Sequence, residues 1–163
     1  MTLWLGVDVG ATRKGFDVAL IDDRSLLELR GRLTVADVVR IADTRAPLVV
    51  AIDSPRSCAP AGHTARPSER ALNRAVCRFA ALAARGHHTI EVFPTASWTR
   101  WCGPRGTVSR AQWSRAGLTQ LGLLDLPERS NQDQRDAIAA AVTAREHTHG
   151  LTEAIGEIVI PTT

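Results

Sequence analysis

The fold can be worked out from one stretch near the N-terminus, Trp4-Leu5-Gly6-Val7-Asp8-Val9-Gly10-Ala11-Thr12-Arg13-Lys14-Gly15. An apolar run with a single acid, Asp8, leads into a turn that contains glycine, and a second apolar run follows from Phe16 to Ile21. This pattern predicts a β-hairpin with a carboxylate among buried residues. A buried carboxylate destabilises a fold unless its charge is compensated, and a bound cation is one solution. This stretch therefore predicts that further ligands of a cation lie elsewhere along the chain.

The whole chain has 163 residues, a formal net charge of +3 and an ordinary balance of apolar and charged residues. This length predicts one domain spanning residues 1–163, with a single core of normal size. No apolar run approaches the roughly 20 residues that a membrane helix needs, and no secretory leader pattern is visible at the N-terminus. We therefore expect a cytoplasmic protein with no membrane partner.

Positive charge is concentrated in the middle of the chain. Between Ser54 and Gln120 the only acids are Glu69 and Glu91, against ten arginines. Arginine forks suit phosphate groups and nucleic-acid backbones. The excess of arginine can also reflect the base composition of a genome. A nucleic-acid partner is therefore one of two interpretations of this basic region.

The first half of the chain predicts a meander followed by a helix and a buried strand. Leu26 to Leu33 alternates apolar and charged residues, as in a strand with one wet face. Thr34 and Asp37 form a capping box for a helix that ends before Pro47. Leu48 to Asp53 is apolar up to its terminal acid, which is typical of a strand covered on both faces.

The second half predicts helices alternating with short strands. The expected elements are a helix from Ser68 to Arg85, a strand over Thr89 to Phe93, a helix from Ala96 to Trp101, a helix from Ser109 to Leu118, a helix capped by Ser130 with Asp133 that runs to about His149, and an edge strand from Glu157 to Pro161. Residues 103–118 match no motif with a known role.

The last helix carries a face of small residues. Alanines at positions 137, 140, 141 and 144 leave one side of it almost bare, which lets a helix lie close to a sheet. Asp136 begins the same face, one turn before Ala140. The order of elements predicts an α/β fold of the RNase H-like type: a mixed five-stranded sheet, with an antiparallel meander and then parallel strands, and helices on both faces.

Several short motifs resemble a known prokaryotic family, domain of unknown function 429. They are Gly6-Val7-Asp8-Val9-Gly10, Ala51-Ile52-Asp53-Ser54-Pro55, Glu91-Val92-Phe93-Pro94, Gln134-Arg135-Asp136-Ala137-Ile138 with Thr143-Ala144, and residues 157–161. Arg66 and Glu69 also match a pair that this family carries. The resemblance implies a nuclease of RNase H-like fold. The opening motif is similar as well to the YqgF group of Holliday-junction-resolvase-like proteins, although Asp53-Ser54-Pro55-Arg56 stands where that group has a glycine-rich stretch.

Such a fold gathers carboxylates from the first strand, the fourth strand and the last helix, which here are Asp8, Asp53 and Asp136. Gathered carboxylates suit Mg²⁺ or Mn²⁺ in a two-metal hydrolysis of phosphodiesters. Each of these acids could also have a purely structural role. Asp8 could accept hydrogen bonds in the hairpin turn, Asp53 could cap the turn that follows it, and Asp136 could be a solvent-exposed residue of the helix. Glu91 either joins the metal ligands or faces solvent at a sheet edge.

Substrate contacts are predicted from the basic middle of the chain. Arg56, Arg66 and Arg70 are candidates for phosphate binding, against a plain role as surface charges. The tryptophans at positions 98, 101 and 113 either stack on bases or belong to the core. The sequence leaves open whether the substrate is DNA or RNA, and whether the protein is a homodimer.

Two rival functions stay open beside the metal-dependent nuclease. One is a nucleic-acid-binding protein that keeps the fold without catalysis. The other is an actin-like phosphotransferase, because Asp8-Val9-Gly10-Ala11-Thr12 looks like the first phosphate loop of actin-like sugar kinases. Such kinases enclose ATP with a second lobe, for which 163 residues leave little room.

Overall fold

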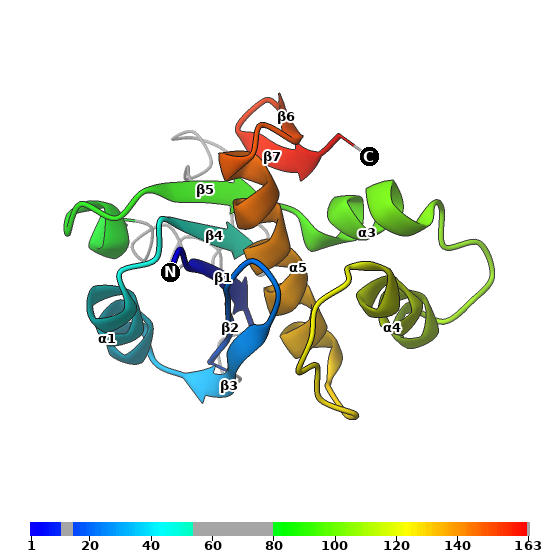
Figure 1. Ribbon diagram of the computed structural model, residues 1–163, viewed down its shortest axis with the longest axis horizontal. Helices are drawn as coiled ribbons and strands as arrows, with labels where there is room; N and C mark the ends of the chain where they lie inside the picture. The colour runs from blue at the N-terminus through cyan, green and yellow to red at the C-terminus, as the bar shows by residue number, and fades with distance from the viewer. Residues whose placement is uncertain (11–14, 54–79, 163) are drawn as a thin grey trace, which may run out of the picture.

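The computed structural model describes residues 1–10, 15–53 and 80–162. Its strands form one seven-stranded sheet in the order β3-β2-β1-β4-β5-β7-β6, crossed by the long helix α5 (Figure 1). The strands are β1 (Trp4–Val9), β2 (Phe16–Ile21), β3 (Leu26–Leu33), β4 (Val49–Asp53), β5 (Thr89–Val92), β6 (Thr152–Ile155) and β7 (Ile158–Pro161). The described helices α1, α3, α4 and α5 span Val35–Arg45, Pro94–Cys102, Arg110–Gln120 and Gln132–Thr148, respectively.

The sheet is mixed, as predicted. Strands β1, β2 and β3 form an antiparallel meander, and β4, β5 and β7 continue from β1 in parallel. The predicted count of five strands was wrong, because a C-terminal hairpin adds two. Strand β7, predicted as the edge, lies between β5 and the antiparallel β6. Four mostly exposed residues make up β6, so its sequence lacks the apolar pattern by which a strand is recognised.

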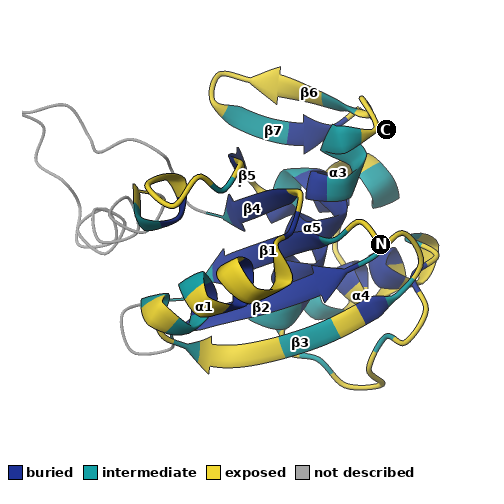
Figure 2. Cartoon of the chain, turned by 60° about the vertical axis from the view of Figure 1, so that its left-hand side comes forward, coloured by how far each residue is buried: buried dark blue, intermediate teal, exposed yellow. Residues whose placement is uncertain are grey.

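Two apolar clusters lie on the two faces of the sheet, since successive residues of a strand point to opposite sides. One face packs against α5, with α3 and α4 outside it. The other face packs against α1 and Leu82. Burial is therefore greatest in α5 and the central strands, whereas β6 and much of β3 are exposed (Figure 2). The prediction of helices on both faces is confirmed.

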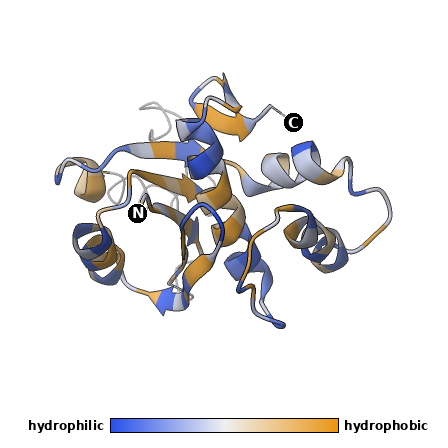
Figure 3. Ribbon diagram, viewed as in Figure 1, coloured by the Kyte–Doolittle hydropathy of each residue, from blue (hydrophilic) through white to orange (hydrophobic). Residues whose placement is uncertain are grey.

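Helix α5 lies unusually close to strand β1. A Cβ atom added to Gly6 would lie 2.1 Å from the carbonyl oxygen of Ala137 and 2.3 Å from the amide nitrogen of Ala141. Only the combination of a glycine with the predicted small-residue face allows this approach. Along α5 the residues change from hydrophilic at the N-terminal end to hydrophobic where the helix meets the sheet (Figure 3).

One of the two predicted capping boxes is confirmed and the other was wrong. Thr34 with Asp37 caps α1, and Ser109, the predicted start of the next helix, caps α4. Helix α5 is capped by Asn131 instead of Ser130, because the Asn131 side chain accepts from the amide of Gln134 at 2.8 Å. Asp133 is thereby placed within the first turn.

Helix α3 begins at Pro94, two residues before the predicted Ala96, since the fixed φ of proline suits a first helical position. The predicted helix from Ser68 lies mostly outside the described residues. None of the helices described here has both the length and the apolar character needed to cross a membrane.

Candidate functional site

Three acids stand side by side across the central strands. The parallel pairing of β1 with β4 sets Asp8 opposite Asp53, and the antiparallel pairing of β1 with β2 sets Asp8 opposite Asp17. Directly paired residues project from the same face of a sheet. Asp8 and Asp17 are only 7% and 5% exposed. The strands therefore form a row of carboxylates, of which Asp17 was not predicted.

Helix α5 brings further acids to this row. Its C-terminal end meets the start of β1, where the indole nitrogen of Trp4 donates to Thr148 at 3.1 Å, and its middle passes Gly6. The helix therefore runs antiparallel to β1, and its N-terminal end lies toward Asp8. Asp136, 3% exposed, and Asp133 lie close enough for their charges to raise the pKa of Asp8. The predicted gathering of Asp8, Asp53 and Asp136 agrees with this geometry.

Burial and mutual repulsion make Asp8 and Asp53 hard to ionise. Burial, followed by the charges of Asp53 and Asp136, raises the pKa of Asp8 to about 8. Burial and the charge of Asp136 raise the pKa of Asp53 to about 7, although the charge of Arg110 and a side-chain hydrogen bond with Asp8 oppose the rise. The folded chain thus holds negative charge at a place that favours protons or cations.

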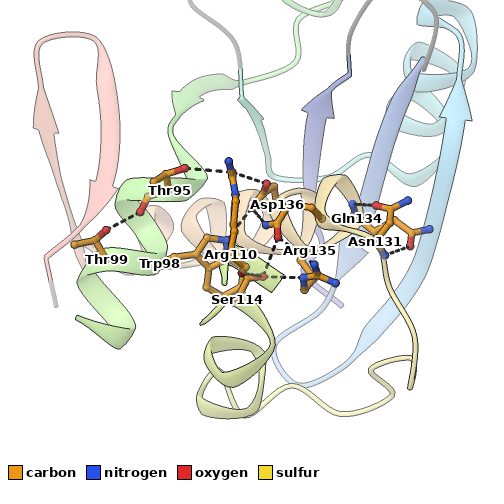
Figure 4. Close-up of polar contacts among 10 residues, drawn as sticks. Thr95, Trp98, Thr99, Arg110, Ser114, Asn131, Gln134, Arg135 and Asp136 are labelled. Atoms are coloured by element: carbon orange, nitrogen blue, oxygen red, sulfur yellow. Dashed lines mark hydrogen bonds and ion pairs between the residues drawn. The ribbon is translucent and has the colours of Figure 1, made fainter. Parts of the chain in front are cut away.

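The Asp136 carboxylate is held by three donors from three elements (Figure 4). Its Oδ1 accepts from the indole nitrogen of Trp98 at 2.8 Å and from the amide nitrogen of Gln132 at 3.0 Å. Its Oδ2 forms an ion pair with Arg110 at 2.8 Å. Burial raises the pKa of Asp136, and these three partners oppose the rise.

Arg110 is the cation of this site that the sequence did not single out. It lies in the first turn of α4, which the Ser109 cap places at the edge of the acid row. Its side chain is 48% exposed. Only its Nη2 atom has partners among the described residues, namely Asp136 and the hydroxyl of Thr95 at 3.2 Å. Its other N–H groups have no hydrogen-bond partner within residues 1–10, 15–53 and 80–162 and could bind a ligand.

The tryptophans belong to the core. Trp98 is fully buried and Trp113 is 7% exposed, so the core interpretation is confirmed for both and base stacking by them was wrong. Trp101 is half-buried and donates to Glu146 at 3.3 Å. Trp98 has a second role that sequence reasoning missed, because its indole nitrogen binds the candidate ligand Asp136.

Glu91 is buried inside the sheet instead of facing solvent at an edge. Its partner on β4 is Ile52, the neighbour of Asp53, so Glu91 projects from the face opposite that of Asp53. Its charge still contributes to the raised pKa of Asp53. Whether it joins a metal shell stays a prediction.

The three predicted phosphate-binding residues, Arg56, Arg66 and Arg70, lie outside the described residues.

Asp133, predicted as a cap, is instead an additional acid of the site. Its spacing of three from Asp136 on a helix was the available signal, since such residues share a face. A cleft of about 690 Å³ opens beside these acids, and its described lining is Asp17, Gly31, Arg32 and residues 131–134.

The donor set suits a hard divalent cation. Carboxylate oxygens are the ligands that Mg²⁺ and Mn²⁺ prefer, and a cation would relieve the repulsion that raises the pKa of Asp8 and Asp53. Within residues 1–10, 15–53 and 80–162, no three His, Cys, Asp or Glu side chains are yet grouped as a metal shell. The residue types present are therefore suitable ligands for a divalent metal ion. The Asp136 carboxylate, however, forms an ion pair with Arg110 in this structure.

Comparison with solved structures identifies the fold. The chain is similar to RuvC of Thermus thermophilus, with 19% identity and a TM-score of 0.57 over 91% of this chain and 97% of that one. The same protein in complex with a Holliday junction substrate gives 17% identity and a TM-score of 0.58 over 92% and 97% of the two chains. The yeast mitochondrial Holliday junction resolvase Ydc2 gives 14% identity and a TM-score of 0.51 over 84% and 75%.

These similarities extend over most of the chain and confirm the predicted RNase H-like fold. No protein-family model matches the sequence, and no curated protein matches it significantly. At such low identity the structures establish the fold, and the function has to be argued from the site.

Proposed function

We propose that this protein is a metal-dependent nuclease that hydrolyses phosphodiester bonds. The observation that carries the proposal is the adjacent pair of the buried Asp8 and the half-buried Asp53, two carboxylates in direct strand register with raised pKa values. Perturbed acids gathered at one place are more typical of a functional site than of a structural ion pair. The resemblance to domain of unknown function 429 is compatible with the proposal and stays a prediction.

Asp8, Asp53 and Asp136 would hold Mg²⁺ or Mn²⁺, with Asp133 beside them. Glu91, which projects from the opposite face of the sheet, would act on these ligands only through its charge. When bound, two such ions supply an activated water and stabilise the leaving oxygen of a phosphodiester. The chain itself contributes fixed ligands, since Asp8 and Asp53 project from neighbouring strands of the sheet. For Asp136 to take part, its Oδ2 has to exchange Arg110 for the metal.

Arg110 would then be free to bind a substrate phosphate next to the acids. A guanidinium presents five donors in a fork that matches phosphate oxygens, and Arg110 uses only Nη2 among the described residues. Arg56, Arg66 and Arg70 are proposed to contact phosphates further along the substrate. Since one of the similar structures contains a Holliday junction substrate, branched DNA is the substrate to test first, before linear duplex DNA and RNA.

Calorimetric titration with Mn²⁺ tests the proposal without a guess about substrate. The natural protein is expected to bind Mn²⁺, and Asp8→Asn is expected to lose the binding while staying folded. Cleavage of a four-way DNA junction in Mn²⁺ should disappear in the same variant. Hydrolysis that persists in Asp8→Asn would exclude Asp8 from the reaction.

A nucleic-acid-binding protein without catalysis is the second candidate, and one observation favours it. Arg110 already neutralises Asp136, and no three metal-ligating side chains are grouped within the described parts of the chain. This alternative predicts DNA or RNA binding that needs no divalent ion and changes little in Asp8→Asn. A junction that is bound and left uncut in Mn²⁺, by a protein that binds no Mn²⁺, would favour it.

A further inference from the structure

Arg135 is buried beside the site, and its hydrogen-bond partners in the described part of the chain are neutral groups. It is 2% exposed and forms no ion pair with any acid in the described part of the chain. Its donors reach neutral oxygens instead: the hydroxyl of Ser114 at 2.7 Å, the amide oxygen of Gln132 at 3.0 Å, and the carbonyl of Ser130. Burying a guanidinium group without an anionic partner lowers the stability of the folded state. A role of Arg135 in the structure around it would account for its presence.

The effect is to fix the orientation of the Gln132 amide. An arginine can only donate hydrogen bonds, so the Gln132 atom that faces Arg135 has to be the oxygen. The Ser114 hydroxyl, 3.1 Å from the same oxygen, is a second available donor. The amide nitrogen of Gln132 is therefore turned toward Asp136, to which it donates at 3.0 Å.

Trp98 holds the same Asp136 oxygen from the other side. Its indole nitrogen donates to Oδ1 at 2.8 Å, and its ring is fixed by the close approach of α4. A Cβ atom added to Gly117 would lie 2.7 Å from the Trp98 ring. With two donors on Oδ1, the carboxylate cannot rotate freely, and Oδ2 is the oxygen presented to a cation, at present Arg110.

We propose that Gln132 and Arg135 are positioning residues, which orient the Asp136 carboxylate so that Oδ2 alone is offered to a cation at the acid row. The role of this orientation in metal binding rests on the proposed nuclease function. The orientation of the Asp136 carboxylate itself follows from the hydrogen bonds described above. Groups that hydrogen-bond a metal-binding carboxylate commonly change metal affinity by 10- to 100-fold.

The same network links Asp136 to helix α4. The Ser114 hydroxyl accepts from Arg135 and lies 2.9 Å from the carbonyl oxygen of Arg110. Since a hydroxyl has one proton, Ser114 donates either to that carbonyl or to the Gln132 oxygen. In both cases Arg135 holds the turn of α4 that carries Arg110 at a fixed place relative to Asp136.

The test combines Mn²⁺ calorimetry with the NMR signal of the Trp98 indole N–H, which reports on Asp136 without metal. The chain has four tryptophans, and Trp98→Phe identifies the relevant signal. Gln132→Met removes the amide at similar volume, and Arg135→Met removes the group that orients it. Gln120→Met, an exposed residue at the end of α4, is the matched control.

In Gln132→Met the Trp98 indole signal is expected to move and Mn²⁺ affinity to fall about 10- to 100-fold, with neither change in Gln120→Met. Arg135→Met should have the same effects, smaller in size, if it folds. A Trp98 signal that stays in place in Gln132→Met, or one that moves while Mn²⁺ affinity is unchanged, overturns the assignment. If the natural protein binds no Mn²⁺, the proposed function fails by itself, and a moving indole signal still supports the orientation of Asp136 by Gln132.

Discussion

The carboxyl group of Asp8 lies where its neutral form is favoured, because burial removes water from it and Asp53 places a second acid beside it. Its pKa of about 8 in the folded protein exceeds the ordinary value of 3.8. Between these two pH values the folded state binds more protons than the unfolded state. The stabilising effect of this proton is complete below about pH 4 and is lost as the pH rises through about 8.

Replacing Asp8 by Asn should therefore stabilise the metal-free protein at pH 8. Each unit of pKa shift corresponds to about 1.4 kcal/mol, so relief of one or two units raises the free energy of unfolding by about 2 kcal/mol, with little gain at pH 4. Urea unfolding in a chelating buffer at the two pH values measures the difference. Asp125→Asn makes the same change at an exposed residue, and an equal gain there would assign the effect to net charge.

Replacing Arg110 by Gln should weaken nucleic-acid binding and reduce its dependence on salt. One phosphate contact contributes about one unit to the slope of log affinity against log salt, so the slope should fall by about one. Filter binding of a four-way DNA junction at several salt concentrations measures it. Arg115→Gln removes an exposed arginine of the same helix. A slope that falls equally in both variants would mean that Arg110 acts only through general charge.

At the scale of elements, the contact between β1 and α5 determines where Asp136 lies. Gly6→Ala would force a Cβ atom into the backbone of Ala137 and Ala141, and backbone cannot move aside as a flexible side chain can. We expect a loss of about 3 kcal/mol or more in the free energy of unfolding, measured in urea. Gly122→Ala, which has open space but a φ of +64°, should cost about 1 kcal/mol. A loss no larger in Gly6→Ala would mean that α5 is not held against β1.

Elements with a strong local signal were predictable from the sequence. The first hairpin follows from two apolar runs around a turn, and the cap of α1 follows from Thr34 and Asp37. The cap of α5 was wrong because Ser130 and Asn131 are adjacent candidates of nearly equal preference, and only the folded chain distinguishes them. Strand β6 is held by pairing with β7, a contact between residues that carry no strand pattern of their own.

The site was predictable where the position along a strand or helix decides it. Asp8 lies one residue before the end of β1, Asp53 ends the neighbouring β4, and Asp136 begins the small-residue face of α5. Arg110 was not predictable, because its place beside Asp136 depends on how α4 packs on α5 across 26 residues of sequence. Sequence alone also left the position of Glu91 open, since the register of β5 against β4 decides its face.

At the scale of the whole molecule, the fold is shared with resolvases at 14–19% identity. Patterning and core volume can maintain a fold while nearly every residue changes. The acid row is therefore the part of the molecule from which function has to be inferred. It also links function to stability, because like charges in a buried place oppose folding until protons or cations neutralise them.

A divalent cation should consequently stabilise the whole protein. Binding to the folded state alone at 100 times the dissociation constant contributes about 2.7 kcal/mol, which for a chain of this length corresponds to a rise of roughly 5–10 °C in Tm. Protons compete with the cation for Asp8 and Asp53, whose pKa values are about 8 and 7. At a fixed Mn²⁺ concentration the rise should therefore be larger at pH 8 than at pH 6.

Thermal unfolding followed by circular dichroism, with and without Mn²⁺, measures this rise. Asp8→Asn and Asp53→Asn should each lose it, whereas Asp125→Asn should keep it. The metal-free variants are expected to unfold at higher temperature than the natural protein at pH 8, so the loss of the Mn²⁺ effect cannot be attributed to a damaged fold. An equal Mn²⁺ effect in all four proteins would place the cation elsewhere. Asp8 and Asp53 would then keep their raised pKa values without serving as metal ligands, as expected for a protein of this fold that binds nucleic acid without cutting it.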